Sequence, residues 1–443
     1  MNTTRTPAQL DATYRLIGWR LIPLLMLGYV SAYIDRSNIG FAKLQFLSDL
    51  QLTETMYGIG AGLFYLGYCL FEVPSNLMLA KIGARATFLR IMVLWSLCSA
   101  ALAFIDDATH FYVLRFFLGA AEAGFFPGVL FYLSQWAPAS RRARFTALFM
   151  SAMALSGIIG GPLAGLIMHS MDGTAGLKGW QWLFLIEGSP GILLGTLSYY
   201  LLADRPRDAS WLSEEQKRWV AEDLAREASA RDVHRQTNFI DALKDRRLYV
   251  LAMMSIALIS GIGGISLWLP SIVRSSGVTD ILHIGMLSAL PYIVAVVVQQ
   301  LVARSSDRHQ ERRWHAAIPA GIAALGWFLL PLVQDMTWLA LGVLTLMTAG
   351  SYGATGPFWS LPASYLSGTA AAGGIAMVTT FGGISGFVSP IIVGWANTAT
   401  GSLASGQIYY GTLMALGAVV LIYGTRSPEA AGVTVSPTTT SPG

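Results

Sequence analysis

Charged side chains are scarce in this chain. Asp, Glu, Lys and Arg make up 12% of its 443 residues, whereas hydrophobic residues make up 54%. Soluble proteins carry about 25% charged residues, so half that share does not keep a chain of this length in solution. The composition excludes a disordered, collagenous or disulfide-stapled chain and indicates a single integral membrane protein.

Cysteine and histidine are also rare, with 2 and 6 copies. Cys69 and Cys98 lie in apolar stretches, where cysteine serves as a small buried hydrophobe. The sequence contains no HExxH motif, no P-loop and no His-rich cluster. We therefore expect neither an enzyme nor a bound metal or cofactor.

Long apolar segments make up most of the sequence. A membrane-spanning helix needs about 20 mostly apolar residues, whereas the strands of a membrane barrel need about ten with alternating apolarity. We predict an all-α integral membrane protein with twelve transmembrane helices in two six-helix halves. The predicted spans are 17–42, 56–80, 87–105, 111–134, 145–169, 180–202, 248–271, 283–303, 315–333, 338–358, 371–396 and 407–424.

One long polar segment separates the two halves. Within it, Ser213 precedes Glu214, Glu215 and Gln216, a pattern that predicts the N-terminus of a surface helix. Related halves are typical of secondary transporters, which bind substrate between them near mid-membrane. The predicted parts are an N-terminal arm (1–16), an N-terminal bundle (17–202), a central loop (203–247), a C-terminal bundle (248–424) and a disordered tail (425–443).

The basic residues predict the orientation. The net charge of +4 could suggest nucleic acid, but in a membrane protein excess Lys and Arg marks cytoplasmic loops. On the predicted topology 24 of the 29 Lys and Arg lie on one side, and only Lys43, Lys178 and Arg274 lie outside. We therefore expect a multi-pass protein of the inner cell membrane with both termini, the arm, the loop and the tail in the cytoplasm.

Asp35 and Arg36 lie deep in the first predicted span. A charged residue at mid-membrane costs about 2.5–3.5 kcal/mol on insertion scales, so it is a functional candidate by default. Adjacent residues on a helix point about 100° apart, and the two side chains should therefore face different partners. A purely structural ion pair that holds helices together is the alternative.

Arg115 and Glu122 in the fourth span are seven residues apart, which places them on one helix face about 10 Å from each other. Arginine binds carboxylates through two parallel hydrogen bonds, and a buried acid exchanges protons as its surroundings change. If the first and fourth spans meet, two acids and two arginines converge. This is the chemistry of a proton-coupled carrier of organic anions.

Other polar groups give weaker signals. Tyr33 and Tyr68 could place hydroxyl groups in a central cavity or pack against protein and lipid. In the second half, Trp359 and Thr379 are candidates for the pocket, with helix packing as the alternative reading. Glu187 lies near the start of the sixth span, where we expect an interfacial or capping role.

Several segments together resemble the major facilitator superfamily, and specifically its anion:cation symporter family. That family includes bacterial tartrate, hexuronate, galactonate and phthalate carriers and animal vesicular and lysosomal organic-anion carriers. The resemblance covers nearly the whole chain and implies the major facilitator fold and a proton-driven symporter that works by alternating access. The segments are YIDRSNIGFA, FEVPSNLMLAKIGAR, RFFLGAAEAGFFPG, WAPASRRAR and GWQWLFLIEGSPGILLG.

The resemblance also implies roles at matching positions. Asp35 and Glu122 would carry protons. Arg36 and Arg115 would bind substrate or couple it to the proton, beside Tyr33 and Tyr68. The segment AKIGARATFLR resembles the gate loop between the second and third spans, and its members are Gly83 and Arg85.

The sequence departs from the family pattern at two places. Gln181 stands where the family often has arginine, and Thr379 and Gly383 stand where sugar-acid carriers tend to have asparagines. Fewer amide groups favour a substrate with fewer hydroxyls. We expect a monomer that imports an organic anion with protons; an exchanger or efflux carrier of the same fold is the alternative. The exact substrate stays open.

Overall fold

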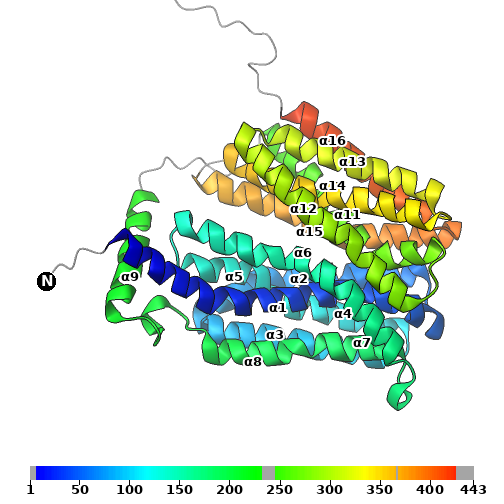
Figure 1. Cartoon of the computed structure of the whole chain (residues 1–443), viewed down its shortest axis with the longest axis horizontal. Helices are drawn as coiled ribbons and strands as arrows, with labels where there is room; N and C mark the ends of the chain where they lie inside the picture. The colour runs from blue at the N-terminus through cyan, green and yellow to red at the C-terminus, as the bar shows by residue number, and fades with distance from the viewer. Residues whose placement is uncertain (1–5, 232–244, 366–367, 426–443) are drawn as a thin grey trace, which may run out of the picture.

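All regular structure in the described part of the chain is helical. The computed structural model describes residues 6–231, 245–365 and 368–425 (Figure 1). Ten helical segments there are long and apolar enough to cross a membrane. They are α1 (Pro7–Asp49), α2 (Glu54–Ile82), α3 (Ala84–Ala101) with η1 (Leu102–Phe104), α4 (Ala108–Glu122) with α5 (Phe125–Ser134), α6 (Ala139–Ser170), α11 (Arg246–Ser275), α12 (Ile281–His309), α13 (Arg313–Val333), α15 (Gly368–Thr400) and α16 (Ala404–Gly424).

Two further positions complete the predicted twelve spans. The helices α7 (Gly179–Gly188) and α8 (Pro190–Leu201) lie end to end, and α8 packs on α3. The helix α14 (Thr337–Tyr365) packs against α12 and α13. The predicted fold class, an all-α membrane protein with two six-helix halves, is therefore confirmed.

Two predicted spans are broken helices. The chain leaves the helix after Glu122 because Gly124 has φ +87°, a left-handed conformation that glycine adopts without strain. A Cβ atom at Gly124 would lie 2.6 Å from Ser75 Oγ, so the packing also requires glycine. The span predicted at 180–202 breaks at Ser189, because Pro190 has no N–H to continue the helix.

Helix caps set two other boundaries. The helix that contains the predicted span 17–42 begins earlier, at Pro7, because Thr6 and Gln9 cap each other's backbone N–H groups. The predicted surface helix is confirmed as α9 (Glu214–Arg231), with Ser213 and Gln216 in the same reciprocal arrangement. Short turns η2 (Thr174–Gly176) and η3 (Pro206–Asp208) complete the elements. The predicted tail after Thr425 and segment 232–244 lie outside the described residues.

The two bundles, α1–α8 and α11–α16, meet along three helix pairs: α1 with α11, α2 with α15, and α6 with α12. Glycines allow the helices to approach closely there. A Cβ atom at Gly58 would lie 2.2 Å from the Pro390 carbonyl oxygen, and one at Gly161 would lie 2.8 Å from the Gly285 carbonyl oxygen. The bundles therefore contact each other backbone to backbone in this conformation.

The molecule has two distinct ends. At the α9 end, α9 packs on the start of α1, where the Tyr14 hydroxyl donates to Asp223 Oδ2 at 3.2 Å. At the opposite end, which we call the distal end, residues 50–53 connect α1 to α2. Hydrogen bonds join the bundles at the distal end, from Tyr57 to the Leu267 carbonyl (3.0 Å) and from Thr55 Oγ1 to Thr398 Oγ1 (2.8 Å). The distal end is therefore closed.

An ion pair between a buried lysine and a half-buried glutamate strengthens this closure. Lys43, expected in an outer loop, instead lies buried in α1 and pairs with Glu54 of α2 at 2.8 Å. The Trp268 indole of α11 donates to Glu54 Oε2 at 3.2 Å, and Lys43 Nζ lies 5.3 Å from the Trp268 ring centre. We call Lys43, Glu54 and Trp268 the distal latch, because they join the two bundles through one carboxylate.

Candidate functional site

An ion pair between α1 and α4 is the central feature of the N-terminal bundle. Arg36 Nε donates to Glu122 Oε1 at 2.7 Å, and Arg36 Nη2 lies 2.5 Å from the same oxygen. The Arg36 side chain is 17% exposed, whereas Glu122 is 1% exposed and its Oε2 has no hydrogen-bond partner. The arginine is therefore partly accessible, whereas Glu122 is sealed and retains one oxygen free for a proton.

Aromatic rings surround the Arg36 guanidinium. Its central carbon lies 5.1 Å from the Tyr33 ring centre, 5.0 Å from that of Tyr68 and 5.4 Å from that of Phe64. Cations within about 6 Å of a ring face are attracted by its quadrupole. The three rings hold the cation in place without neutralising it, so it remains able to bind an anion.

Asp35 points to other partners, as expected for the residue next to Arg36. Its Oδ1 accepts hydrogen bonds from Ser99 Oγ of α3 at 2.7 Å and from Asn38 Nδ2 at 3.3 Å. The side chain is 1% exposed, and Oδ2 has no partner. Asp35 is therefore sealed inside the bundle, on a different face of α1 from the ion pair.

Arg115 lies on the same helix as Glu122 but does not join the ion pair. It is 1% exposed, and its Nε donates to the Gly60 carbonyl at 3.4 Å. Its guanidinium lies 4.8 Å from the Phe64 ring, which also contacts Arg36. The predicted convergence of four charges is thus partial: Arg36 meets Glu122, while Asp35 and Arg115 occupy separate positions around them.

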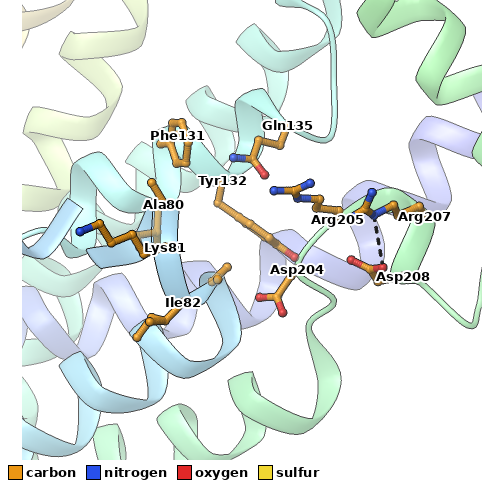
Figure 2. A pocket seen from close by; sticks show the side chains of 13 residues that line it. Ala80, Lys81, Ile82, Phe131, Tyr132, Gln135, Asp204, Arg205, Arg207 and Asp208 are labelled. Carbon is orange, nitrogen blue, oxygen red and sulfur yellow. Dashed lines mark ion pairs between the residues drawn. The ribbon is translucent and has the colours of Figure 1, made fainter. Parts of the chain in front are cut away.

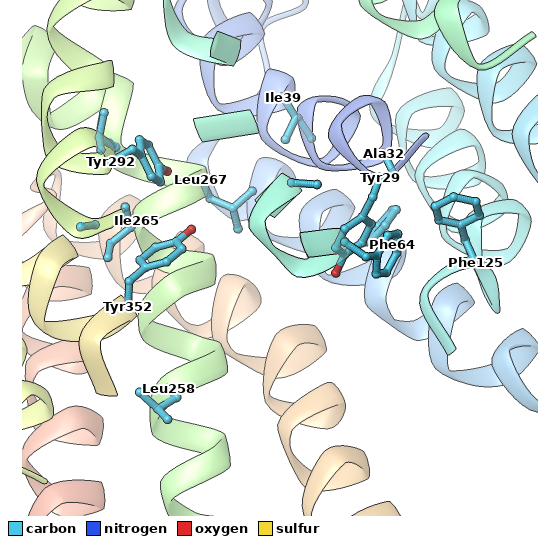
Figure 3. Packing of buried hydrophobic residues seen from close by; sticks show 14 of the residues in the cluster. Tyr29, Ala32, Ile39, Phe64, Phe125, Leu258, Ile265, Leu267, Tyr292 and Tyr352 are labelled. Carbon is cyan, nitrogen blue, oxygen red and sulfur yellow. The ribbon is translucent and has the colours of Figure 1, made fainter. Parts of the chain in front are cut away.

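The C-terminal bundle contributes tyrosines that sequence reasoning missed. Tyr292 and Tyr352 form an edge-to-face pair with ring centres 5.9 Å apart, and Figure 3 shows them across from Tyr29 and Phe64. A tyrosine in mid-span needs a partner for its hydroxyl, and this is the signal that could have marked Tyr292 and Tyr352.

The predicted pocket residues of that bundle lie elsewhere. Trp359 is half-buried and packs on Phe358; it is seven residues, about 10 Å, beyond Tyr352 toward the α9 end. Thr379 is exposed, and its hydroxyl donates to the Ile375 and Ala376 carbonyls of its own helix. In the described part of the chain no hydrogen bond or ring contact joins either residue to Arg36, and their role in binding stays a prediction.

The predicted gate residues form the turn between α2 and α3. Gly83 has φ +88°, and a Cβ atom there would lie 2.5 Å from Asp204 Oδ1. The Arg85 backbone N–H donates to the same carboxylate at 3.0 Å, and its side chain donates to the Tyr199 carbonyl at 2.6 Å. Asp204 thereby caps α3, and the turn is tied to the end of α8.

A pocket of about 260 Å³ lies beside this turn at the α9 end. Figure 2 shows Asp204 below Tyr132, with Arg205, Arg207 and Asp208 along one side. Tyr132 donates to the Ala203 carbonyl at 2.6 Å and closes the floor. The pocket is formed entirely by the N-terminal bundle and the start of the central segment, and the ion pair does not line it.

Gln181, where the family often has arginine, has a local role. Its Oε1 accepts from the Lys178 backbone N–H at 2.9 Å, and its Nε2 donates to the Ala103 carbonyl at 2.7 Å. It therefore caps α7 and ties it to the end of η1. Glu187 departs from expectation more strongly: it is 3% exposed inside the bundle, not at an interface or a helix cap.

Two helical bundles that meet along several helix pairs are typical of secondary transporters. Residues 25–390 match the family model of the Major Facilitator Superfamily, and the chain belongs to that superfamily. It is a multi-pass membrane transporter of small molecules, not an enzyme. The inward-open xylose transporter XylE from E. coli shares its fold, with TM-score 0.74 and 16% identity over 92% of this chain and 96% of that chain.

Bacterial relatives support the resemblance to organic-anion carriers. The chain is 43% identical to NicT, named for metabolite transport in Pseudomonas putida, over 90% of this chain and 92% of the relative. It is 42% identical to a protein named as a tartrate transporter in Agrobacterium vitis, over 94% and 92%. It is 39% identical to a quinolone resistance transporter of Acinetobacter baumannii, over 92% and 94%.

Proposed function

We propose that the protein is a proton-coupled symporter that imports an organic carboxylate of the tartrate, sugar-acid or aromatic-acid type. The observation that carries this proposal is the pairing of a reachable Arg36 with a buried Glu122. A proton on Glu122 would remove its charge and release the guanidinium for the carboxylate of the substrate. Proton binding and anion binding would then favour each other.

The conformation can be assigned from which end faces the cytoplasm. The basic residues favour a cytoplasmic α9 end, with both termini inside and the protein in the inner membrane of a bacterial cell. The closed distal end would then correspond to the inward-facing half of an alternating-access cycle. In this proposal, the tyrosines of the C-terminal bundle close over the substrate when the bundles rock together at the α9 end.

The test is uptake into proteoliposomes with an imposed inward proton gradient. The panel is radiolabelled tartrate, galactonate and phthalate. For the accumulated acid, Glu122→Gln should abolish accumulation against its gradient, because a neutral amide cannot exchange a proton. It should retain counterflow without a gradient, because Arg36 remains available. Glu215→Gln on α9 serves as the matched control.

Gradient-driven accumulation by Glu122→Gln at the wild-type level would contradict the coupling role. The affinity for the organic acid tests the role of Arg36, the other partner of the ion pair. Arg36→Ala should raise the half-saturating concentration by about tenfold to a hundredfold, since a charge-assisted hydrogen bond contributes about 1.5–3 kcal/mol. An unchanged half-saturating concentration would contradict the role of Arg36 as the carboxylate ligand.

A second candidate is an efflux carrier that uses the same residues in the opposite direction. The relative named as a quinolone resistance transporter favours it. In inverted membrane vesicles, uptake of norfloxacin driven by an outward-directed proton gradient would support efflux. Counterflow of an organic acid with no pH dependence would favour an exchanger.

A further inference from the structure

A third acidic side chain lies buried behind the ion pair. Glu187 of α7 is 3% exposed, and neither of its carboxyl oxygens has a hydrogen-bond partner. A buried ionised carboxylate without partners is far more costly than a protonated one. No part of the proposed exchange between Arg36 and Glu122 uses this group.

Glu187 faces Asp35 and Asn38 of α1. Asp35 is the one titratable group that acts on it electrostatically among the described residues. On the other side, Gly188 lies against α3, where a Cβ atom would come 2.8 Å from Ser99 Oγ. Ser99 in turn donates to Asp35 Oδ1. The helices α1, α3 and α7 thus enclose two carboxyl groups in one buried cluster.

This cluster contains more hydrogen-bond acceptors than donors. The atoms Asp35 Oδ2, Asn38 Oδ1, Glu187 Oε1 and Glu187 Oε2 are all without partners. All four are acceptors when the carboxyl groups are ionised. Ser99 and one N–H of the Asn38 amide serve Asp35 Oδ1, which leaves the second N–H of Asn38 as the one donor that faces the Glu187 carboxyl group. Buried polar groups in proteins are normally satisfied. Protons on the carboxyl groups would supply the missing donors.

We infer that Glu187 and Asp35 form a carboxyl pair that holds the coupling proton behind α1. The inference rests on the proposed proton-coupled transport and adds a third proton-carrying group to it. Two carboxylates in one buried site cannot both ionise, so the pair retains at least one proton while it releases another.

The pair is linked to the ion pair through α4. Asp35 interacts electrostatically with Glu122 and with Arg115, both on that helix. When Asp35 loses its proton, its negative charge disfavours a second negative charge on Glu122 and so favours the protonated form of Glu122. That form frees Arg36. Transfer of a proton from the Asp35–Glu187 pair to Glu122 would therefore release Arg36 for the anion, while the proton stays on the carrier as symport requires.

Infrared spectroscopy of the purified protein tests the pair without any substrate. The carbonyl stretch of protonated carboxyl groups should be present in the wild type at neutral pH and should change as the pH is raised. Glu187→Gln should remove one such band, whereas Glu215→Gln, an exposed acid on α9, should leave the spectrum unchanged. Asp35→Asn provides a second variant and should shift the titration of the band that Glu187 retains.

Uptake then gives the functional readout. For tartrate or whichever panel acid the wild type accumulates, Glu187→Gln should change the pH profile of gradient-driven uptake and keep counterflow. If both Glu187→Gln and Asp35→Asn keep the wild-type infrared spectrum, the inference is wrong. If no panel acid is accumulated but the infrared band is lost, the proposed function fails and the carboxyl pair stands.

Discussion

At the scale of single residues, Glu122 occupies an unfavourable place. It is the last residue of α4, and the C-terminal end of a helix carries partial negative charge. Burial adds to the cost of its ionised form. The Arg36 guanidinium offsets both effects. The helix break at Gly124 therefore makes Glu122 dependent on Arg36, and this dependence is what allows a proton or a ligand to exchange with it.

A double-variant experiment measures this dependence. Arg36→Leu should lower the free energy of unfolding by about 3–5 kcal/mol, the usual cost of leaving one partner of a buried ion pair uncompensated. Adding Glu122→Gln should recover much of the loss, because the uncompensated charge is gone. Thermal unfolding in detergent, followed by tryptophan fluorescence, measures the loss in the single variant and the recovery in the double variant. Additive losses in the double variant would contradict the pairing.

The turn at Gly83 gives a second prediction at this scale. Gly83→Ala should destabilise the protein more than Gly173→Ala. Gly173 lies in the left-handed region, which costs an alanine about 1–2 kcal/mol, whereas Gly83 has ψ 169°, a conformation essentially restricted to glycine, and is also packed against Asp204. A Cβ atom at Gly173 meets nothing within 4 Å. Equal shifts in the unfolding temperature would mean that the backbone conformation and packing of Gly83 impose no extra cost on alanine.

Sequence reasoning reached some of these residues and missed others for a physical reason. The free-energy cost of placing a charge in the membrane identified Arg36 and Glu122 as functional candidates. They are 86 positions apart in the sequence and meet in the structure. The same reasoning placed Glu187 at an interface, because depth in the membrane was counted from span ends. Span ends shift by several residues, whereas burial depends on which helices pack around α7. Only the packing brings Glu187 to Asp35.

At the scale of helices, hydropathy predicted where the spans lie. It did not predict where helices break or which side chains join one helix to another. The breaks at Gly124 and Ser189 leave the hydrophobic pattern intact, so no periodicity signals them. Lys43 looked like a loop residue because it follows an apolar run, although α1 continues to Asp49. A carboxylate on α2 and an indole on α11 compensate its burial there. Neither partner could be assigned before the helices were arranged.

The distal latch gives the prediction at this scale. Glu54→Gln should open the distal end more often, because it leaves the buried Lys43 charge uncompensated in the closed state. The readout is a cysteine placed at Thr55 in a variant that lacks Cys69 and Cys98. It should react with an impermeant maleimide about tenfold faster, which corresponds to a loss of about 1.4 kcal/mol in the stability of the closed distal end.

The control variant is Lys178→Met, which breaks an ion pair with Asp49 at the same end but within one bundle. Its labelling rate should equal that of the parent protein. If Glu54→Gln and Lys178→Met label at the same rate, the latch does not hold the bundles together.

At the scale of the whole molecule, the sequence predicted two bundles and the side that each loop occupies, because hydropathy and the basic residues are properties of the chain. It did not predict which end is closed. The same helices and the same loops serve both ends of an alternating-access cycle, and only contacts between bundles distinguish the states. In this structure those contacts include the Thr55–Thr398 hydrogen bond and the close approach of Gly58 to Pro390.

Alternation itself is testable by cross-linking. With Cys69 and Cys98 replaced by serine, Thr55→Cys/Thr398→Cys should form a disulfide on oxidation, because the two hydroxyl oxygens are 2.8 Å apart. The disulfide would join α2 to α15 across the bundles and hold the distal end closed. Uptake of the accumulated acid into proteoliposomes should be lost on oxidation and restored by a reductant.

The matched control is Ser260→Cys/Ser389→Cys, whose hydroxyl oxygens are 2.9 Å apart but belong to α11 and α15 of the same bundle. If the bundles move as rigid bodies, this cross-link should leave uptake intact, since it spans no surface that separates. Uptake that survives the Thr55–Thr398 cross-link would mean that the distal end stays closed throughout transport. Alternation between the bundles would then be wrong, whatever the roles of Arg36 and Glu122.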